Sequence, residues 1–314
     1  MNGKDFPHRQ CQYLFRIVLC TVIVLAWGNL AHAGANDDAG AGGNLVIYQI
    51  KPSTADPSIQ RYDDANVVVL DRSRTAASQL VVFMPGTGGK PLNDMGLLQV
   101  VANQGYRVIG LEYNDSPAVV QVCPREPPRC SGDFRHKRIY GDDVTHVVDN
   151  TKNESIVNRL SRLLRYLDQS HPDEGWSLYL RGDTPDWERV VVSGLSQGAG
   201  MAAYIAQREP VARVVLFSSP WDYSGGSRTL APWIGESSVT PPERWFAELH
   251  RRENTAKAIA QAYLTLRIPV EHIRVFDLDL PPAYHGHSDN PYHASTAHMQ
   301  AYAPEWRFLF GAPP

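Results

Sequence analysis

Positive charge and cysteine are both in short supply in this sequence. The 314 residues carry 30 Lys and Arg against 33 Asp and Glu, which gives a formal net charge of −3. This balance does not indicate a basic face for the phosphate backbone of a nucleic acid, so we expect no nucleic-acid partner. Two of the four cysteines lie within the first 20 residues, and the remaining two are too few for a cysteine-based zinc site. The chain does have 43% hydrophobic residues, enough for one large folded core.

A long apolar run lies near the N-terminus. Basic residues precede Ile17–Trp27, and the small-residue pattern Ala31-His32-Ala33 follows it. This order is typical of a secretory signal peptide, and the run is shorter than the roughly 20 residues that a membrane-spanning helix needs. We therefore expect residues 1–33 to be a signal peptide and residues 34–44 to be a flexible mature N-terminus. The mature protein would be secreted or periplasmic, without a stable membrane span.

Export would place the remaining cysteines in an oxidising compartment. Cys11 and Cys20 lie within the predicted signal peptide, which leaves Cys123 and Cys130 with six residues between them. An even pair in such a compartment predicts one disulfide. Both cysteines belong to segment 114–141, which contains four prolines and shows little periodicity. We interpret this segment as an inserted loop, stapled by the disulfide, on the side of the sheet where the strands end.

Short apolar runs alternate with amphipathic stretches along the rest of the chain. Apolar strands separated by helices indicate a mostly parallel sheet with helices on both faces, the α/β fold class. Residues 45–49 and 67–70 are expected to add antiparallel strands at one edge. No internal repeat or long linker is present, so residues 45–314 are predicted to form a single domain. The other predicted strands are 79–84, 107–113, 189–193, 213–217 and 273–278, and the predicted helices are 156–167, 201–207, 255–266 and 295–310.

A serine framed by glycines follows one of the predicted strands. The β-branched run Val190–Val192 leads into Gly194-Leu195-Ser196-Gln197-Gly198, and a helix rich in small residues follows. A sharp turn from strand to helix would expose the Ser196 hydroxyl at the helix N-terminus, where the helix dipole favours developing negative charge. Gly194 and Gly198 would remove side chains that collide in such a turn. We therefore predict that Ser196 is a nucleophile.

This pentapeptide resembles the nucleophile elbow of the α/β-hydrolase superfamily, and that of bacterial carboxylesterases and thioesterase-like hydrolases in particular. The resemblance extends in strand order from about residue 79 to the C-terminus. It implies an α/β-hydrolase fold and a serine hydrolase that acts on carboxylic esters. In this superfamily the catalytic residues follow one another along the chain as nucleophile, acid and histidine.

A glycine-rich loop upstream has the features of an oxyanion hole. One donor to the developing oxyanion should be the backbone N–H of Gln197, the residue after the nucleophile. The other should come from the loop after an earlier strand, where Met84–Gly89 lies. Glycines let the backbone approach a substrate, so the N–H of Gly86 or Thr87 is the second expected donor. This loop does not end in the Lys-Ser/Thr pair of a phosphate-binding P-loop.

The catalytic histidine is expected after the last predicted strand. His287 lies there between two small residues, and we predict that it is the general base. His285 and His293 are alternatives close by. His298 is expected within the last helix in a structural role.

Two carboxylates fit the position of the acid. Glu253 closes segment 245–254, which we interpret as a strand and its exit loop, the usual acid position in the superfamily. Asp222 lies just past the predicted strand 213–217 and is the alternative. Either carboxylate would hold the tautomer of the histidine and stabilise the imidazolium ion.

These residues predict a secreted serine hydrolase that cleaves a carboxylic ester through an acyl-enzyme on Ser196, with His287 as general base. The substrate would be a small-molecule or polymeric ester, and no cofactor or metal is expected. A hydrolase fold without a working triad would instead be a binding protein. The same triad with a different leaving-group site would be an amidase or a peptidase.

Overall fold

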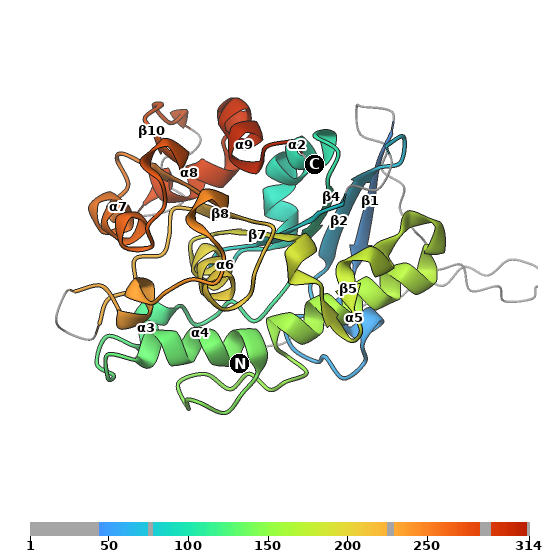
Figure 1. Ribbon diagram of the computed structural model, residues 1–314, viewed down its shortest axis with the longest axis horizontal. Coiled ribbons are helices and arrows are strands. Elements are labelled where there is room, and N and C mark those ends of the chain that lie inside the picture. Colours follow the sequence, from blue (N-terminus) through green and yellow to red (C-terminus); the bar gives the residue numbers. More distant parts are fainter. Residues whose placement is uncertain (1–43, 75–77, 225–228, 283–289, 313–314) are drawn as a thin grey trace, which may run out of the picture. The chain divides into compact units, whose positions relative to one another are not determined.

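The computed structural model describes residues 44–74, 78–224, 229–282 and 290–312. Within them, an eight-stranded sheet has the strand order β1-β2-β4-β3-β7-β8-β9-β10 (Figure 1). β2 pairs antiparallel with β1 and β4, as expected for the edge, and the other neighbours pair parallel. The strands are β1 (Leu45–Ile50), β2 (Asn66–Asp71), β3 (Leu80–Met84), β4 (Arg107–Gly110), β7 (Val190–Leu195), β8 (Arg213–Phe217), β9 (Trp245–His250) and β10 (Ile273–Phe276), with a separate pair β5 (Leu180–Arg181) and β6 (Thr184–Pro185).

Helices cover both faces of the sheet, as Figure 1 shows for α4 and α5 on one side and α2 and α9 on the other. This mostly parallel sheet between two helical layers is the α/β-hydrolase fold expected from the sequence. One layer contains α4 (Cys130–Tyr140), α5 (Ile156–Ser170), α6 (Gln197–Arg208) and α7 (Ala256–Thr265). The other contains α2 (Met95–Asn103), α8 (Pro291–His298) and α9 (Ala303–Phe310). Two single-turn helices are α1 (Pro52–Ala55) and α3 (Val119–Val122).

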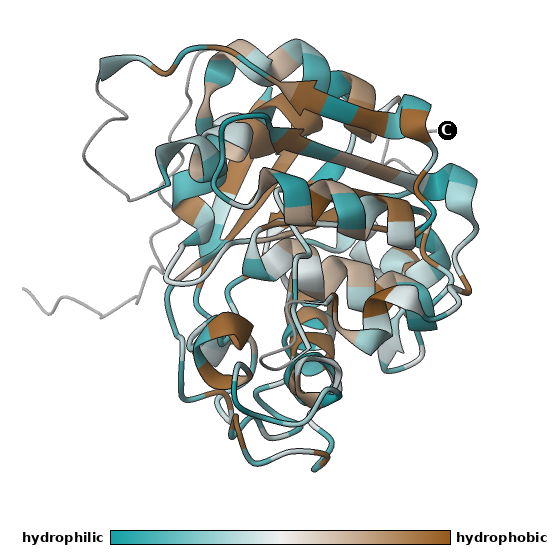
Figure 2. Cartoon of the chain, turned by 90° about the vertical axis from the view of Figure 1, so that its left-hand side faces the viewer, coloured by the Kyte–Doolittle hydropathy of each residue, from teal (hydrophilic) through white to brown (hydrophobic). Residues whose placement is uncertain are grey.

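The valine-rich strands follow from this layering. Val191 packs with α2, α8 and α9, whereas Val190 and Val192 pack with α4, α5 and α6. Side chains alternate across a strand, so a strand covered on both faces needs apolar residues at every position. In Figure 2 the helices, by contrast, carry both hydrophobic and hydrophilic residues. The leucines of α5 show the expected helical spacing and are buried.

Two segments differ in detail from the sequence-based prediction. Segment 114–141 is not loop throughout, because it contains α3 and the eleven-residue helix α4. The periodicity of α4 is weak since Arg135, Lys137 and Arg138 are buried along with its apolar residues. The last predicted helix is interrupted at Met299, whose extended backbone (ψ 108°) ends α8, and Pro304 then lies in the first turn of α9.

The predicted disulfide between Cys123 and Cys130 is present, with their Cα atoms 5.6 Å apart. It joins the end of α3 to the first residue of α4. Over the residues that the structure describes, no helix combines the length and the apolar character needed to cross a membrane. The predicted signal peptide lies outside those residues, as do His285 and His287.

Candidate active site

Ser196 lies at the junction of β7 and α6 in an unusual backbone conformation. Its φ of 54° and ψ of −116° are sparsely populated by residues other than glycine and store conformational strain. The Ser196 N–H donates to the carbonyl of Phe217 on β8 (2.9 Å), which ties the turn to the neighbouring strand. Ser196 is partly exposed, although Leu195 and Gln197 on either side are buried. The predicted sharp turn from strand to helix is therefore present at this serine.

Two glycines allow this turn to pack against the end of β3. A Cβ atom at Gly198 would lie 1.9 Å from the carbonyl oxygen of Met84, and one at Gly194 would lie 2.5 Å from the same oxygen. Neither position can accept a side chain without displacing backbone. The absence of side chains at Gly194 and Gly198 thus lets the turn at Ser196 pack closely against Met84, in line with the role predicted for these glycines.

The loop after β3 lies against Ser196. A Cβ atom at Gly86 would be 3.2 Å from the Cβ of Ser196, so the two residues are direct neighbours. The Gly89 N–H donates to the Gly86 carbonyl (2.9 Å), which fixes the plane of the following peptide bond and hence the direction of the Thr87 N–H. Thr87, Ser196 and Gln197 line one small crevice. As the first residue of α6, Gln197 has an N–H without a partner inside the helix.

Residues directly after β4 hold this loop in place. The buried Tyr113 hydroxyl donates to the carbonyl of Pro85 (2.9 Å). The Lys90 ammonium lies 3.0 Å from the Glu112 carboxylate and 2.7 Å from that of Asp64. Burial raises the pKa of Glu112 to about 7, although Lys90 opposes the shift. These supports were not predicted from the sequence, although the polar residues directly after an apolar strand were a signal for them.

A glutamate and a histidine meet beyond the end of β9. Glu253 Oε2 lies 2.7 Å from Nδ1 of His293, which belongs to α8. Glu253 Oε1 accepts from the His250 N–H (2.9 Å) and from the Ser218 hydroxyl (3.0 Å). The Glu253 side chain is fully buried, and that of His293 is 18% exposed. A carboxylate only accepts, so in neutral His293 this contact places the proton on Nδ1 and leaves Nε2 as an acceptor.

The Glu253–His293 pair lies beyond the carboxyl ends of the strands, as Ser196 does. The parallel strands β7, β8 and β9 are neighbours, with Leu195 opposite Phe217 and Phe217 opposite Glu248. Ser196 follows β7 and Ser218 follows β8, and Ser218 binds the Glu253 carboxylate. Adjacent strand ends therefore bring the serine turn and the acid–histidine pair to one side of the molecule.

A second glutamate, Glu248, lies on β9 near Glu253. Its side chain is fully buried. Burial, and then the negative charge of Glu253, raise the pKa of Glu248 well above its usual range. The neutral acid is thus favoured at Glu248.

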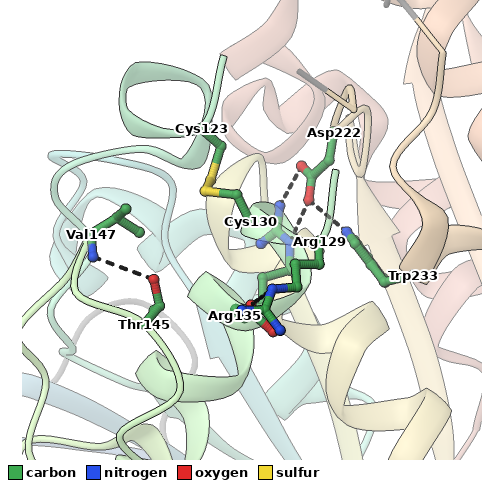
Figure 3. The surroundings of a disulfide bond; sticks show 9 residues. Cys123, Arg129, Cys130, Arg135, Thr145, Val147, Asp222 and Trp233 are labelled. Atoms are coloured by element: carbon green, nitrogen blue, oxygen red, sulfur yellow. Dashed lines mark hydrogen bonds and ion pairs between the residues drawn. A yellow bond between two sulfur atoms is a disulfide. The ribbon is translucent and has the colours of Figure 1, made fainter. Parts of the chain in front are cut away.

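Asp222 has different partners. Its carboxylate accepts from Nε (2.7 Å) and Nη2 (2.6 Å) of Arg135 and from the Trp233 indole (2.9 Å), as Figure 3 shows. Both Asp222 and Arg135 are buried, so they form an internal ion pair. His298, expected in a structural role, binds buried Asp94 through Nε2 (2.9 Å).

The chain matches no protein-family model and no curated protein. It is similar to the solved structure of a cold-adapted esterase from an Arctic intertidal metagenomic library, with a TM-score of 0.47 and 11% identity over 86% of this chain and 95% of that one. It is also similar to a bacterial heroin esterase, with a TM-score of 0.46 and 13% identity over 90% of this chain and 86% of that one. An S-formylglutathione hydrolase from Agrobacterium tumefaciens gives a TM-score of 0.44 and 11% identity over 85% of this chain and 95% of that one.

Proposed function

We propose that this chain is a serine hydrolase that cleaves carboxylic esters through an acyl-enzyme on Ser196. The observation that carries the proposal is the conformation of Ser196. A non-glycine residue with a φ of 54°, set between a central strand and a helix, is strained. Strained residues of this kind cluster at active sites, and here the loop at Gly86 lies directly beside the serine.

In the proposed reaction the Ser196 hydroxyl attacks the ester carbonyl carbon, and a histidine takes the hydroxyl proton. The backbone N–H of Gln197 and that of Thr87 or Gly86 stabilise the resulting oxyanion. Collapse of the tetrahedral intermediate releases the alcohol, which receives the proton from the histidine. Water then attacks the acyl-enzyme in the same manner, which yields the carboxylic acid and free Ser196.

Glu253 is the proposed acid of this triad. Its buried carboxylate contacts a histidine, whereas that of Asp222 is held by Arg135 and Trp233. The sequence favours His287 as the base, and His287 lies outside the described residues. The 2.7 Å contact between Glu253 and His293 supports His293 instead. We therefore propose His293 as general base and treat His287 as the competing assignment.

Secretion to the periplasm or the medium is part of the proposal. The order of residues in segment 1–33 supports an export signal, and the disulfide between Cys123 and Cys130 suits an oxidising compartment.

Hydrolysis of p-nitrophenyl acetate by the wild type and by Ser196→Ala tests the proposal. Loss of the nucleophile should lower kcat by at least about 10⁴-fold. Ser58→Ala, which changes an exposed serine, is the matched control and should leave the rate unchanged. A Ser196→Ala protein with full activity would overturn the proposal.

A further inference from the structure

An apolar pocket opens beside the crevice of Ser196. It has a volume of about 250 Å³, and its walls include Val119, Val120, Pro124 and Trp221 together with Cys123 of the disulfide. α3, the disulfide and the start of α4 thus form one wall, and the segment after β8 forms the opposite wall. The pocket surface is mainly apolar, and Ser131 and Asp222 are the polar residues of its lining.

The pocket and the serine crevice are neighbours. Val119, Val120, Trp221 and Asp222 line both of them. A group attached to Ser196 would therefore lie directly beside the pocket. The disulfide-stapled insertion is the element that encloses this space.

The charged residues at the pocket are already neutralised. Asp222 lines the pocket, but its carboxylate is paired with the Arg135 guanidinium at 2.6 Å. Figure 3 shows this pair close to the Cys123–Cys130 bridge. Arg135 Nη1 also donates to the carbonyl of Gln197 (3.4 Å), which links the pocket wall to the residue after Ser196. The pocket therefore offers apolar contact and no unpaired charge, which favours an uncharged ligand group.

We propose that this pocket binds the apolar acyl group of the ester, and that it accepts an acyl group of about eight non-hydrogen atoms. This inference rests on the proposed function of Ser196. One water molecule occupies about 30 Å³, so a space of 250 Å³ holds roughly eight groups of that size. The acyl group stays bonded to Ser196 through both half-reactions, whereas the alcohol leaves after the first. An apolar pocket that adjoins Ser196 therefore suits the acyl side.

A series of p-nitrophenyl esters from acetate to laurate tests the proposal in the wild type. Each methylene that enters the pocket should raise kcat/KM by up to about fourfold. The value should therefore be highest near hexanoate and octanoate and fall at laurate, whose chain exceeds the pocket. A kcat/KM that does not change with acyl length, or that still rises at laurate, would overturn the proposed pocket size.

Two variants change the pocket in opposite directions. Val120→Trp should fill it and lower the hexanoate-to-acetate ratio of kcat/KM by at least about tenfold. Tyr223→Ala should enlarge it, because partly exposed Tyr223 lines its mouth, and should shift the optimum to longer acyl groups. Val270→Trp is the matched control, since Val270 is 70% exposed and outside the pocket lining, and its ratio should equal that of the wild type.

The outcomes separate this inference from the proposed function. If the wild-type protein hydrolyses none of the esters and does not react with a fluorophosphonate, both the hydrolase function and the acyl pocket are ruled out. Active wild type with an unchanged ratio in Val120→Trp and an unchanged optimum in Tyr223→Ala would remove the pocket alone. If Val120→Trp instead changed the preference among acetate esters of longer alcohols, the pocket would bind the alcohol and the acyl assignment would be wrong.

Discussion

Nδ1 of His293 and Oε2 of Glu253 lie 2.7 Å apart and join helix α8 to the end of β9. The other oxygen of Glu253 accepts from the His250 amide and from the Ser218 hydroxyl. A buried carboxylate held by two other donors has a fixed orientation, so it also fixes the orientation of the imidazole and, in its neutral form, the tautomer. A general base beside a serine nucleophile needs this arrangement.

Glu253→Gln should lower kcat for p-nitrophenyl acetate by about 10⁴-fold at neutral pH. Glutamine retains the shape of glutamate, but its amide nitrogen can donate to Nδ1 and so favours the wrong tautomer of the histidine. Glu271→Gln, at an exposed glutamate, is the control and should keep the wild-type rate. A folded Glu253→Gln protein with a rate within tenfold of the wild type would remove Glu253 from the triad.

The two candidate histidines can be separated by alanine substitution. We expect His293→Ala to lower kcat by about 10⁴-fold, because the partner of Glu253 is lost, and His287→Ala to have a much smaller effect. Added imidazole should restore part of the activity of the His293→Ala protein. The reverse ranking of the two variants would assign the base to His287.

Tyr113→Phe should lower kcat about tenfold with little change in KM. The lost hydroxyl holds the Pro85 carbonyl, so the loop at Gly86 and Thr87 would position its N–H donors less well. Tyr106→Phe is the matched control, since its buried hydroxyl likewise donates to a backbone carbonyl, that of Phe310. Equal kcat values for the two variants would show that Tyr113 does not act through the loop.

Asp222→Asn should destabilise the fold by about 3 kcal/mol, because it leaves the buried Arg135 guanidinium without a counter-charge. Urea unfolding measures this difference. Asp143→Asn breaks an ion pair of Lys137 in which the aspartate is 95% exposed, and it should change stability little. Equal unfolding free energies for the two variants would contradict the role given to the Arg135–Asp222 pair.

Much of the fold could be predicted because its signals are local. Valine-rich runs separated by amphipathic helical segments predict a parallel sheet with helices on both faces. An even pair of cysteines after a predicted export signal predicts a disulfide. Ser196 and the loop at Gly86 each come directly after a predicted parallel strand. Their positions in the sequence therefore predicted that they lie close together. Helix α4 was missed because burial of Arg135 depends on Asp222, which lies 87 residues away in the sequence.

The sequence ranks the candidate histidines only by their neighbours in the chain, and this criterion favours His287. His285, His287 and His293 all follow the last strand within nine positions, and any of them satisfies the chain order of the superfamily. Which one meets the acid depends on the path of the chain into α8. The contact between His293 and Glu253 is a tertiary feature with no counterpart in local sequence.

Reaction of the purified protein with a fluorophosphonate, followed by mass spectrometry of its tryptic peptides, tests the central claim most directly. An activated serine should acquire one phosphonate group on Ser196, and the Ser196→Ala protein should acquire none. Unmodified Ser196, under conditions that fully label a reference serine hydrolase, would contradict the account and favour a hydrolase-fold protein that binds without catalysis.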